Sequence, residues 1–72
     1  MADTDRIDHR EGGFPNIGQP ALRALEGVGV TRLEQLTAWR AVDIGALHGM
    51  GPKGVRLLAE ALALAGLSFR VA

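Results

Sequence analysis

Four residues near the middle of the chain have the types and the spacing of a small phosphate-binding site. Gly49, Gly51 and Gly54 surround Lys53, and Pro52 stands where a helix would begin. Glycine permits a tight turn, and proline suits the first helical position, whose N–H group has no partner inside the helix. The first N–H groups of a helix bind anions, and a lysine beside them adds a positive charge. These residues therefore predict a contact with phosphate.

The same residues also have a purely structural interpretation, and the sequence leaves it open. Gly49 and Gly51 would then only end one helix and reverse the chain. Lys53 favours the functional interpretation, because a cation at a helix N-terminus opposes the helix dipole. Arg56, one turn later, would either reach the same phosphate or pair with Glu60.

A similar segment occurs earlier in the chain and predicts a second copy of this turn. Gly27 and Gly29 precede Gly49 and Gly51 by 22 residues, and each pair encloses one apolar residue. We interpret the first hairpin (residues 27–32) and the second hairpin (residues 49–54) as parts of two helix–hairpin–helix units related by a pseudo-twofold axis. Three further residues are assigned to the phosphate-contacting surface: Arg23, Thr31 and Arg32. Thr31 is also expected to cap a helix.

The hydrophobic pattern predicts a compact all-α domain of four to five helices over residues 14–70. Helices are expected at about 19–27, 41–48 and 52–65, together with one that begins after Thr31 in a capping box completed by Glu34. Apolar residues from every part of this domain are expected to be buried: Phe14, Ile17, Leu33, Leu36, Trp39, Met50, Leu67 and Phe69.

Composition narrows the range of functions. Residues 1–13 alternate acids and bases with almost no apolar content, and we expect a disordered tail there. The chain has no cysteine and two histidines, so we expect no disulfide and no metal site. No catalytic constellation stands out, which predicts a non-enzymatic protein without a cofactor. No apolar run approaches the ~20 residues of a membrane helix, and we expect a cytoplasmic protein.

The charge balance predicts weak rather than strong binding of nucleic acid. The formal net charge of the chain is zero. From Gln19 onward, however, six Lys and Arg residues face four Asp and Glu residues. A weakly positive surface is therefore expected on the folded part, and a strongly positive one is not.

Several of these motifs together resemble the C-terminal domain of the bacterial RNA polymerase α subunit, within the helix–hairpin–helix DNA-binding superfamily. The matching motifs, between about Ile17 and Phe69, are Leu22-x-x-Leu25, Val30-Thr31-x-Leu33-x-x-Leu36, Leu47-x-Gly49-Met50-Gly51-x-Lys53 and Leu64-Ala65-Gly66-Leu67-Ser68-Phe69. The resemblance implies that the second hairpin contacts the backbone of double-stranded DNA. The chain departs from the family at Pro20, where the family has a groove-entering arginine, and at Pro52, where it has a second basic residue.

We therefore expect a small module that binds DNA weakly and with little sequence preference, because contacts to phosphate position a protein without specifying a sequence. The alternative is a protein-interaction module that keeps the fold without binding nucleic acid. The wide apolar stripe of the last helix motivates this alternative. A protein partner, or a second copy in a homodimer, would then dock on Leu57, Ala61 and Leu64.

Overall fold

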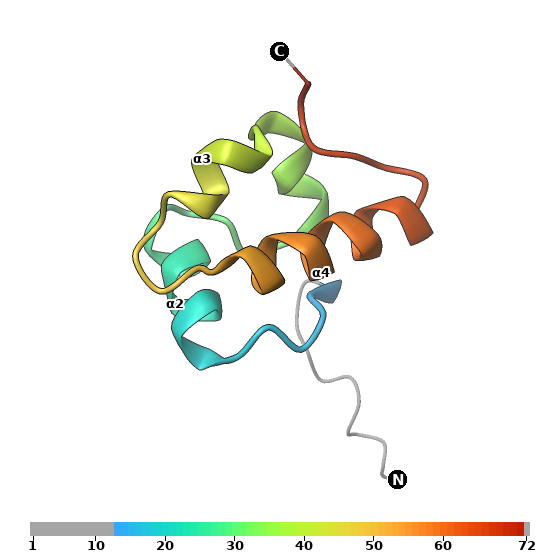
Figure 1. Cartoon of the computed structure of the whole chain (residues 1–72). Coiled ribbons are helices and arrows are strands. Elements are labelled where there is room, and N and C mark those ends of the chain that lie inside the picture. The colour runs from blue at the N-terminus through green and yellow to red at the C-terminus, as the bar shows by residue number, and fades with distance from the viewer. Residues whose placement is uncertain (1–12, 72) are drawn as a thin grey trace, which may run out of the picture.

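The computed structural model describes residues 13–71, so the expected disordered tail lies outside the described residues except for Gly13. Four helices form this part of the chain: α2 (Gln19–Gly27), the 3-10 helix η2 (Leu33–Ala38), α3 (Ala41–Gly45) and α4 (Pro52–Leu64). The longest, α4, packs against α3 and η2, and its first turn lies near α2 (Figure 1). The prediction of a compact all-α domain is confirmed with four helices.

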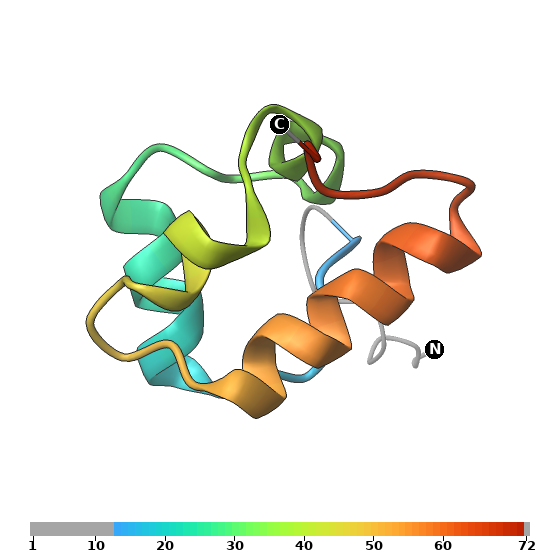
Figure 2. The same cartoon turned by 45° about the horizontal axis from the view of Figure 1, so that its top comes forward.

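The helices are arranged around a common centre (Figure 2), where their buried side chains form an apolar core. Leu25, Leu36, Ile44, Leu58 and Leu62 are completely inaccessible, so every helix places at least one side chain inside. Burial of large aliphatic side chains is the main stabilising contribution in a domain of this size. The remaining buried residues come mostly from the turns and the N-terminal segment: Phe14, Ala21, Val30, Leu33 and Met50.

Most of the residues predicted to be buried are found against this core. Ile17, Trp39 and Phe69 are half-buried and pack on it, in addition to the buried Phe14 and Met50. The exception is Leu67, which was also expected to be buried and retains 37% of its accessible surface. The C-terminal segment is instead tied down by its backbone, since the N–H of Arg70 donates to the carbonyl oxygen of Trp39 at 2.8 Å.

The second helix differs from the prediction in type. It is a 3-10 helix, and its buried residues Leu33 and Leu36 are followed at the same spacing by the half-buried Trp39. A spacing of three residues matches the three residues per turn of a 3-10 helix, and it also occurs on one face of an α-helix. The sequence pattern therefore located this helix without distinguishing the two types.

The third helix is shorter than predicted. It ends at Gly45 instead of His48, and the chain continues through turns in which the N–H of Met50 donates to the carbonyl of Leu47 at 3.0 Å. Glycine inside a helix costs about 1 kcal/mol relative to alanine, which favours an early end. The predicted bounds of α2 agree with the structure, and α4 ends one residue before the predicted position.

The two hairpins are not spaced as the 22-residue repeat predicted. A positive φ occurs at Gly29 (82°) and at Gly49 (94°), which are 20 residues apart. A buried residue follows each of them, Val30 in the first hairpin and Met50 in the second. Val28, enclosed by the first glycine pair, is 37% exposed. The repeat inferred from the glycine pairs was therefore wrong by two residues, because the glycines of the first pair do not have the conformations of the second.

Candidate nucleic-acid interface

The second hairpin lies directly against the beginning of α2. A Cβ atom built on Gly49 would stand 2.8 Å from the carbonyl oxygen of Pro20, so only a residue without a side chain fits there. Pro20 belongs to the first turn of α2, and Pro52 opens α4 directly after the N-cap residue Gly51. The N-termini of two helices are therefore adjacent in space although more than thirty residues separate them in sequence.

These two helix ends border one depression of ≈ 400 Å³. Gly18 and Ala21 line it from the side of α2, and Gly51, Lys53 and Gly54 line it from the side of α4. The lysine is the only charged residue in the lining, and no carboxylate of the described residues contributes to it. An anion in this depression would meet a cation and no competing negative charge.

Several backbone amides at the start of α4 are available to an acceptor. No backbone carbonyl within residues 13–71 accepts a hydrogen bond from the N–H groups of Gly51, Lys53 or Gly54. The next amide, that of Val55, donates to the carbonyl of Gly51 at 3.1 Å and so begins the helical pattern. Neither α2 nor α4 has an acidic residue in its first turn or a side-chain cap. Both helix ends therefore keep the positive end of their dipole uncompensated by their own first turns.

The predicted phosphate-contacting residues of the second hairpin differ in accessibility. Gly49, Gly51 and Lys53 are exposed, and Gly54 is half-buried. A Cβ atom on Gly54 would approach the Sδ atom of Met50 to 2.9 Å, so this glycine lets the buried methionine pack under the first turn of α4. Met50 thus packs against the inner side of the hairpin, while the amides on its outer side remain accessible.

Arg56 follows Lys53 on the exposed surface of α4. It does not pair with Glu60, because the ion pairs within 4.0 Å among the described residues are Arg32–Glu34 and Arg40–Asp43. Of the two alternatives left open for Arg56, the ion pair with Glu60 is therefore absent from the structure.

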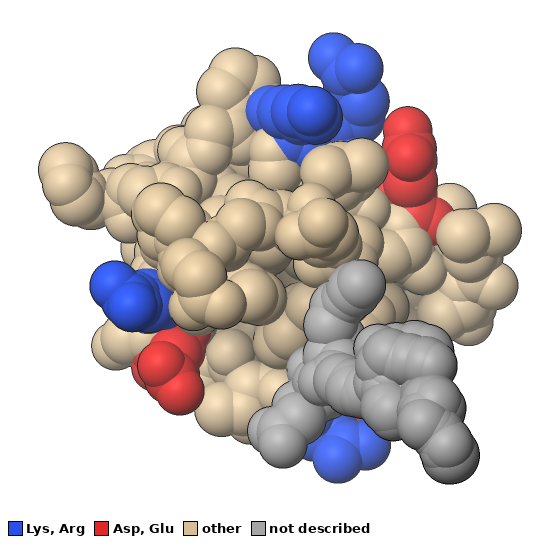
Figure 3. Space-filling view, turned by 90° about the horizontal axis from the view of Figure 1, so that it is seen from below, with Lys and Arg blue, Asp and Glu red and all other residues tan. Residues whose placement is uncertain are grey.

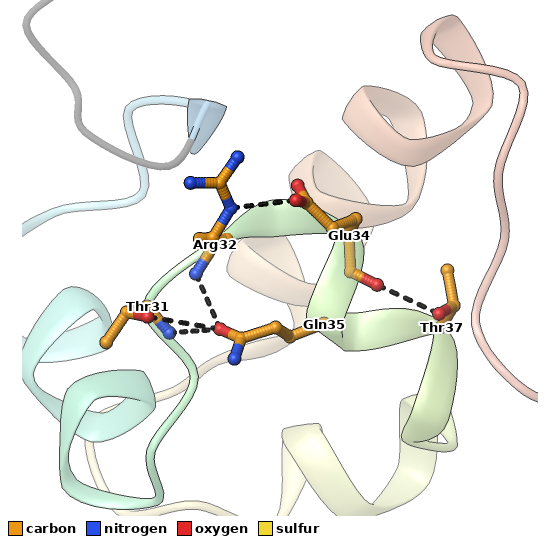
Figure 4. Close-up of polar contacts among 5 residues, drawn as sticks. All are labelled: Thr31, Arg32, Glu34, Gln35 and Thr37. Atoms are coloured by element: carbon orange, nitrogen blue, oxygen red, sulfur yellow. Dashed lines mark hydrogen bonds and ion pairs between the residues drawn. The ribbon is translucent and has the colours of Figure 1, made fainter.

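The first hairpin has a different arrangement, in which its amides already have an acceptor (Figure 4). The backbone N–H groups of Thr31 and Arg32 both donate to Oε1 of Gln35, at 2.6 and 2.8 Å. The hydroxyl of Thr31 lies 3.2 Å from the same oxygen. A single glutamine side chain therefore takes the place that an anion would occupy at this hairpin.

The predicted capping box of Thr31 and Glu34 was wrong, because Gln35 is the acceptor in the structure. Counting from Thr31 as the cap led to Glu34, but the N-cap of η2 is Arg32, and the acceptor three residues later is Gln35. Glu34 instead accepts a hydrogen bond from Nε of Arg32 at 2.7 Å, and this contact, with a backbone hydrogen bond, lowers the pKa of the Glu34 carboxyl below its ordinary value. The charge of Arg32 is thereby partly neutralised by its own neighbour.

The remaining predicted residues lie apart from the depression. Arg23 is exposed on α2 and does not line it. His48 is exposed next to the hairpin, and Trp39 is half-buried against the core; neither residue lines the depression. Figure 3 shows one face of the molecule, on which Lys and Arg side chains lie near the edge and form no continuous basic patch.

The structure also adds residues that the sequence analysis did not assign to this site. Gly18, which has a φ of 91°, and Asn16 line the depression from the segment before α2. The sequence did contain a signal for this segment, because Gly18 shortly precedes Pro20 just as Gly51 precedes Pro52. Only the contact between Gly49 and α2 shows that the two signals belong to one site.

Other kinds of site find no support in the described part of the chain. Residues 13–71 contain no group of three or more His, Cys, Asp or Glu side chains placed to hold a metal ion. None of the described helices has both the length and the apolar character that crossing a membrane requires. Comparisons of the chain with protein-family models, with curated proteins and with solved structures gave no match.

Proposed function

We propose that this protein is a small, non-enzymatic DNA-binding module whose second hairpin contacts the phosphate backbone of a duplex. The observation that carries the proposal is the meeting of two helix N-termini at one depression that contains Lys53 and no carboxylate. The resemblance to the helix–hairpin–helix domain of the RNA polymerase α subunit supports it. In this proposal the domain consists of two helix–hairpin–helix units with approximate twofold symmetry, of which only the second is used as a phosphate contact.

The contact would be made mainly by backbone groups. The N–H groups of Gly51, Lys53 and Gly54 would donate to the oxygens of one phosphate, and the ammonium group of Lys53 would add its charge. Arg56 stands about 4.5 Å further along α4 at 1.5 Å per residue, so its long side chain would reach the same phosphate or the next one. Thr31 and Arg32 are left out of this interface, because Gln35 and Glu34 already engage them.

Such an interface predicts weak, salt-sensitive binding. With two to four phosphates engaged and a log–log salt slope of about −0.9 per phosphate, affinity falls about 10- to 150-fold between 50 and 200 mM salt. Backbone contacts carry little sequence information, so duplexes of different sequence should bind almost equally. A net charge of zero gives no long-range attraction that would offset this loss.

The test is an amide-resolved NMR titration of the full chain with a 12-base-pair duplex at 50 mM salt. We expect the largest shifts at Gly49, Gly51, Lys53 and Gly54. Lys53→Gln should weaken binding and reduce the salt slope by about 0.9. Arg40→Gln is the matched control, since it removes one positive charge outside the interface. If the second-hairpin amides stay unmoved while another face responds, or if both variants weaken binding equally, the proposal is wrong.

A second candidate function, protein–protein interaction through α4, is favoured by one observation. Leu64 is 91% exposed at the C-terminal end of α4, and Leu57 and Ala61 are half-buried on the same side. An exposed leucine of this kind suits a contact with a second copy or another protein. Sedimentation of the wild type and of Leu64→Gln at high concentration tests it, since a monomer in both cases argues against self-association on this face.

A further inference from the structure

A second hollow, of ≈ 520 Å³, lies along the C-terminal half of α4. Ala59 and Ala63 line it from α4, and Val42 lines it from α3. Its remaining wall is the extended segment of residues 67–71, which leaves the end of α4 and returns toward η2 (Figures 1 and 2). We call this hollow the C-terminal groove; none of the residues that line it also lines the depression at the second hairpin.

The lining of the C-terminal groove is mostly apolar and accessible. Val42 is 67% exposed and Val71 is 93% exposed. Ala59 and Ala63 stand one helical turn apart, so small side chains form this wall and allow a close approach of another chain. The volume is within the range of pockets that bind ligands.

The charges at the C-terminal groove are all of one sign and gather at one end. Arg40 and Arg70 are the only charged residues in the lining. The backbone N–H of Arg70 donates to the carbonyl of Trp39 at 2.8 Å, which places Arg70 beside Arg40. Asp43 binds Arg40 through two contacts of 3.1 and 3.4 Å, whereas no described carboxylate lies within ion-pair distance of Arg70.

We propose that the C-terminal groove binds a short segment of a partner protein in which bulky apolar side chains stand next to carboxylates. The apolar side chains would cover Val42 and Val71 over the two alanines, and a carboxylate would pair with Arg70. Five extended residues span about 16 Å, so the segment alongside residues 67–71 would be four to six residues long. DNA does not fit this surface, because the groove offers apolar walls where a duplex would present phosphates.

This interaction is independent of the proposed DNA contact. The two surfaces share only the helix α4, which contributes Lys53 and Gly54 to one and Ala59 and Ala63 to the other. Failure of one proposal therefore leaves the other standing, and each has its own set of reporting amides.

The test uses a synthetic ten-residue peptide with blocked ends, containing two leucines and one phenylalanine between glutamates. A control peptide carries lysine in place of each glutamate. We expect saturable shifts of groove amides in the full chain with the acidic peptide, and at least fivefold weaker binding to Ala63→Gln and to Arg70→Glu. Arg70→Glu should also bind the lysine peptide better than the wild type does. Ala46→Gln is the matched control, because Ala46 is exposed and lines neither the C-terminal groove nor the depression at the second hairpin, and it should keep affinity within twofold.

Several results would overturn the proposal. Among them are no saturable shift at 1 mM acidic peptide, equal binding of the lysine peptide, and shifts confined to the second hairpin. A concentration-dependent dimer that Ala63→Gln abolishes would assign the C-terminal groove to a second copy of the chain instead. Should Ala63→Gln fail to fold, Val71→Asp gives the same test outside any helix, and unchanged affinity for that variant would exclude the groove.

Discussion

Substituting Gly49 tests the contact on which the candidate interface depends. In Gly49→Ala, the positive φ of 94° costs about 1–2 kcal/mol for a residue with a side chain. The new Cβ would also stand 2.8 Å from the carbonyl oxygen of Pro20, a backbone atom that cannot move without displacing α2. Overpacking of this kind adds about 1–3 kcal/mol. We therefore expect Gly49→Ala to lower the free energy of unfolding by about 2–5 kcal/mol.

Gly29 provides a matched control within the same molecule. Its φ of 82° is nearly the same, but no atom lies within 4 Å of a Cβ built on it. Gly29→Ala should therefore cost only the backbone contribution of about 1–2 kcal/mol. Gly66, with a φ of 77° and equally open surroundings, should behave like Gly29. Urea denaturation of the three variants, followed by circular dichroism, measures the difference.

The same pair of variants separates fold from function. At a concentration of salt and a temperature at which both remain folded, Gly49→Ala should lose most of its affinity for a fluorescent duplex, because the start of α2 is pushed away from α4. Gly29→Ala should bind like the wild type. Equal losses of stability in Gly49→Ala and Gly29→Ala would refute the close approach as the distinguishing feature. Unchanged affinity in a destabilised Gly49→Ala would refute its role in the interface.

Three further predictions concern the rest of the fold. Gln35→Ala removes the shared acceptor of the first hairpin and should lower the free energy of unfolding by about 1–2 kcal/mol in urea denaturation, whereas a neutral result would show that water replaces this side chain. Leu58→Ala, at a completely buried position, should cost about 2–5 kcal/mol, while Leu64→Ala on the exposed side of the same helix should stay within about 0.5 kcal/mol. Because the pKa of Glu34 is lowered, its contact with Arg32 stabilises the fold at pH values above the ordinary carboxyl pKa of 4.5, and this stabilisation is lost as the pH falls through the lower folded-state pKa. The effect should be small at this exposed site. It should be absent from the pH dependence of thermal unfolding of Glu34→Gln.

The elements with strong local signals were predictable from the sequence. A proline near the first helical position marked the beginning of α2 and of α4, and a glycine marked the end of each: Gly27 is the last residue of α2, and Gly66 lies two residues beyond α4. Apolar residues at helical spacing identified Leu33 and Leu36 as core positions of the second helix, because a helix must turn one face inward. Met50 was also predictable, since a single apolar residue between two glycines has little else to pack against than the core.

The features that were missed depend on contacts between distant segments or on one-residue shifts. The register of the first hairpin is set by Gly29, which has the positive φ in place of Gly27, and the N–H of Val30 donates to the carbonyl of Leu25 at 2.9 Å. This shift moves the cap from Thr31 to Arg32, and hence the acceptor from Glu34 to Gln35. The contact of the second hairpin with α2 has no local signal at all, because it joins parts of the chain that are far apart in sequence.

The helix α4 sets the spacing between the two surfaces proposed above. Ten residues separate Lys53 from Ala63, which corresponds to about 15 Å of a single rigid rod. A partner protein that itself binds DNA and also carries an acidic segment for the C-terminal groove would gain avidity, because contact at one surface fixes the position of the other surface without a flexible linker. Leu58 and Leu62 fix this rod in the core along its length, so neither surface can turn relative to the other while the domain is folded.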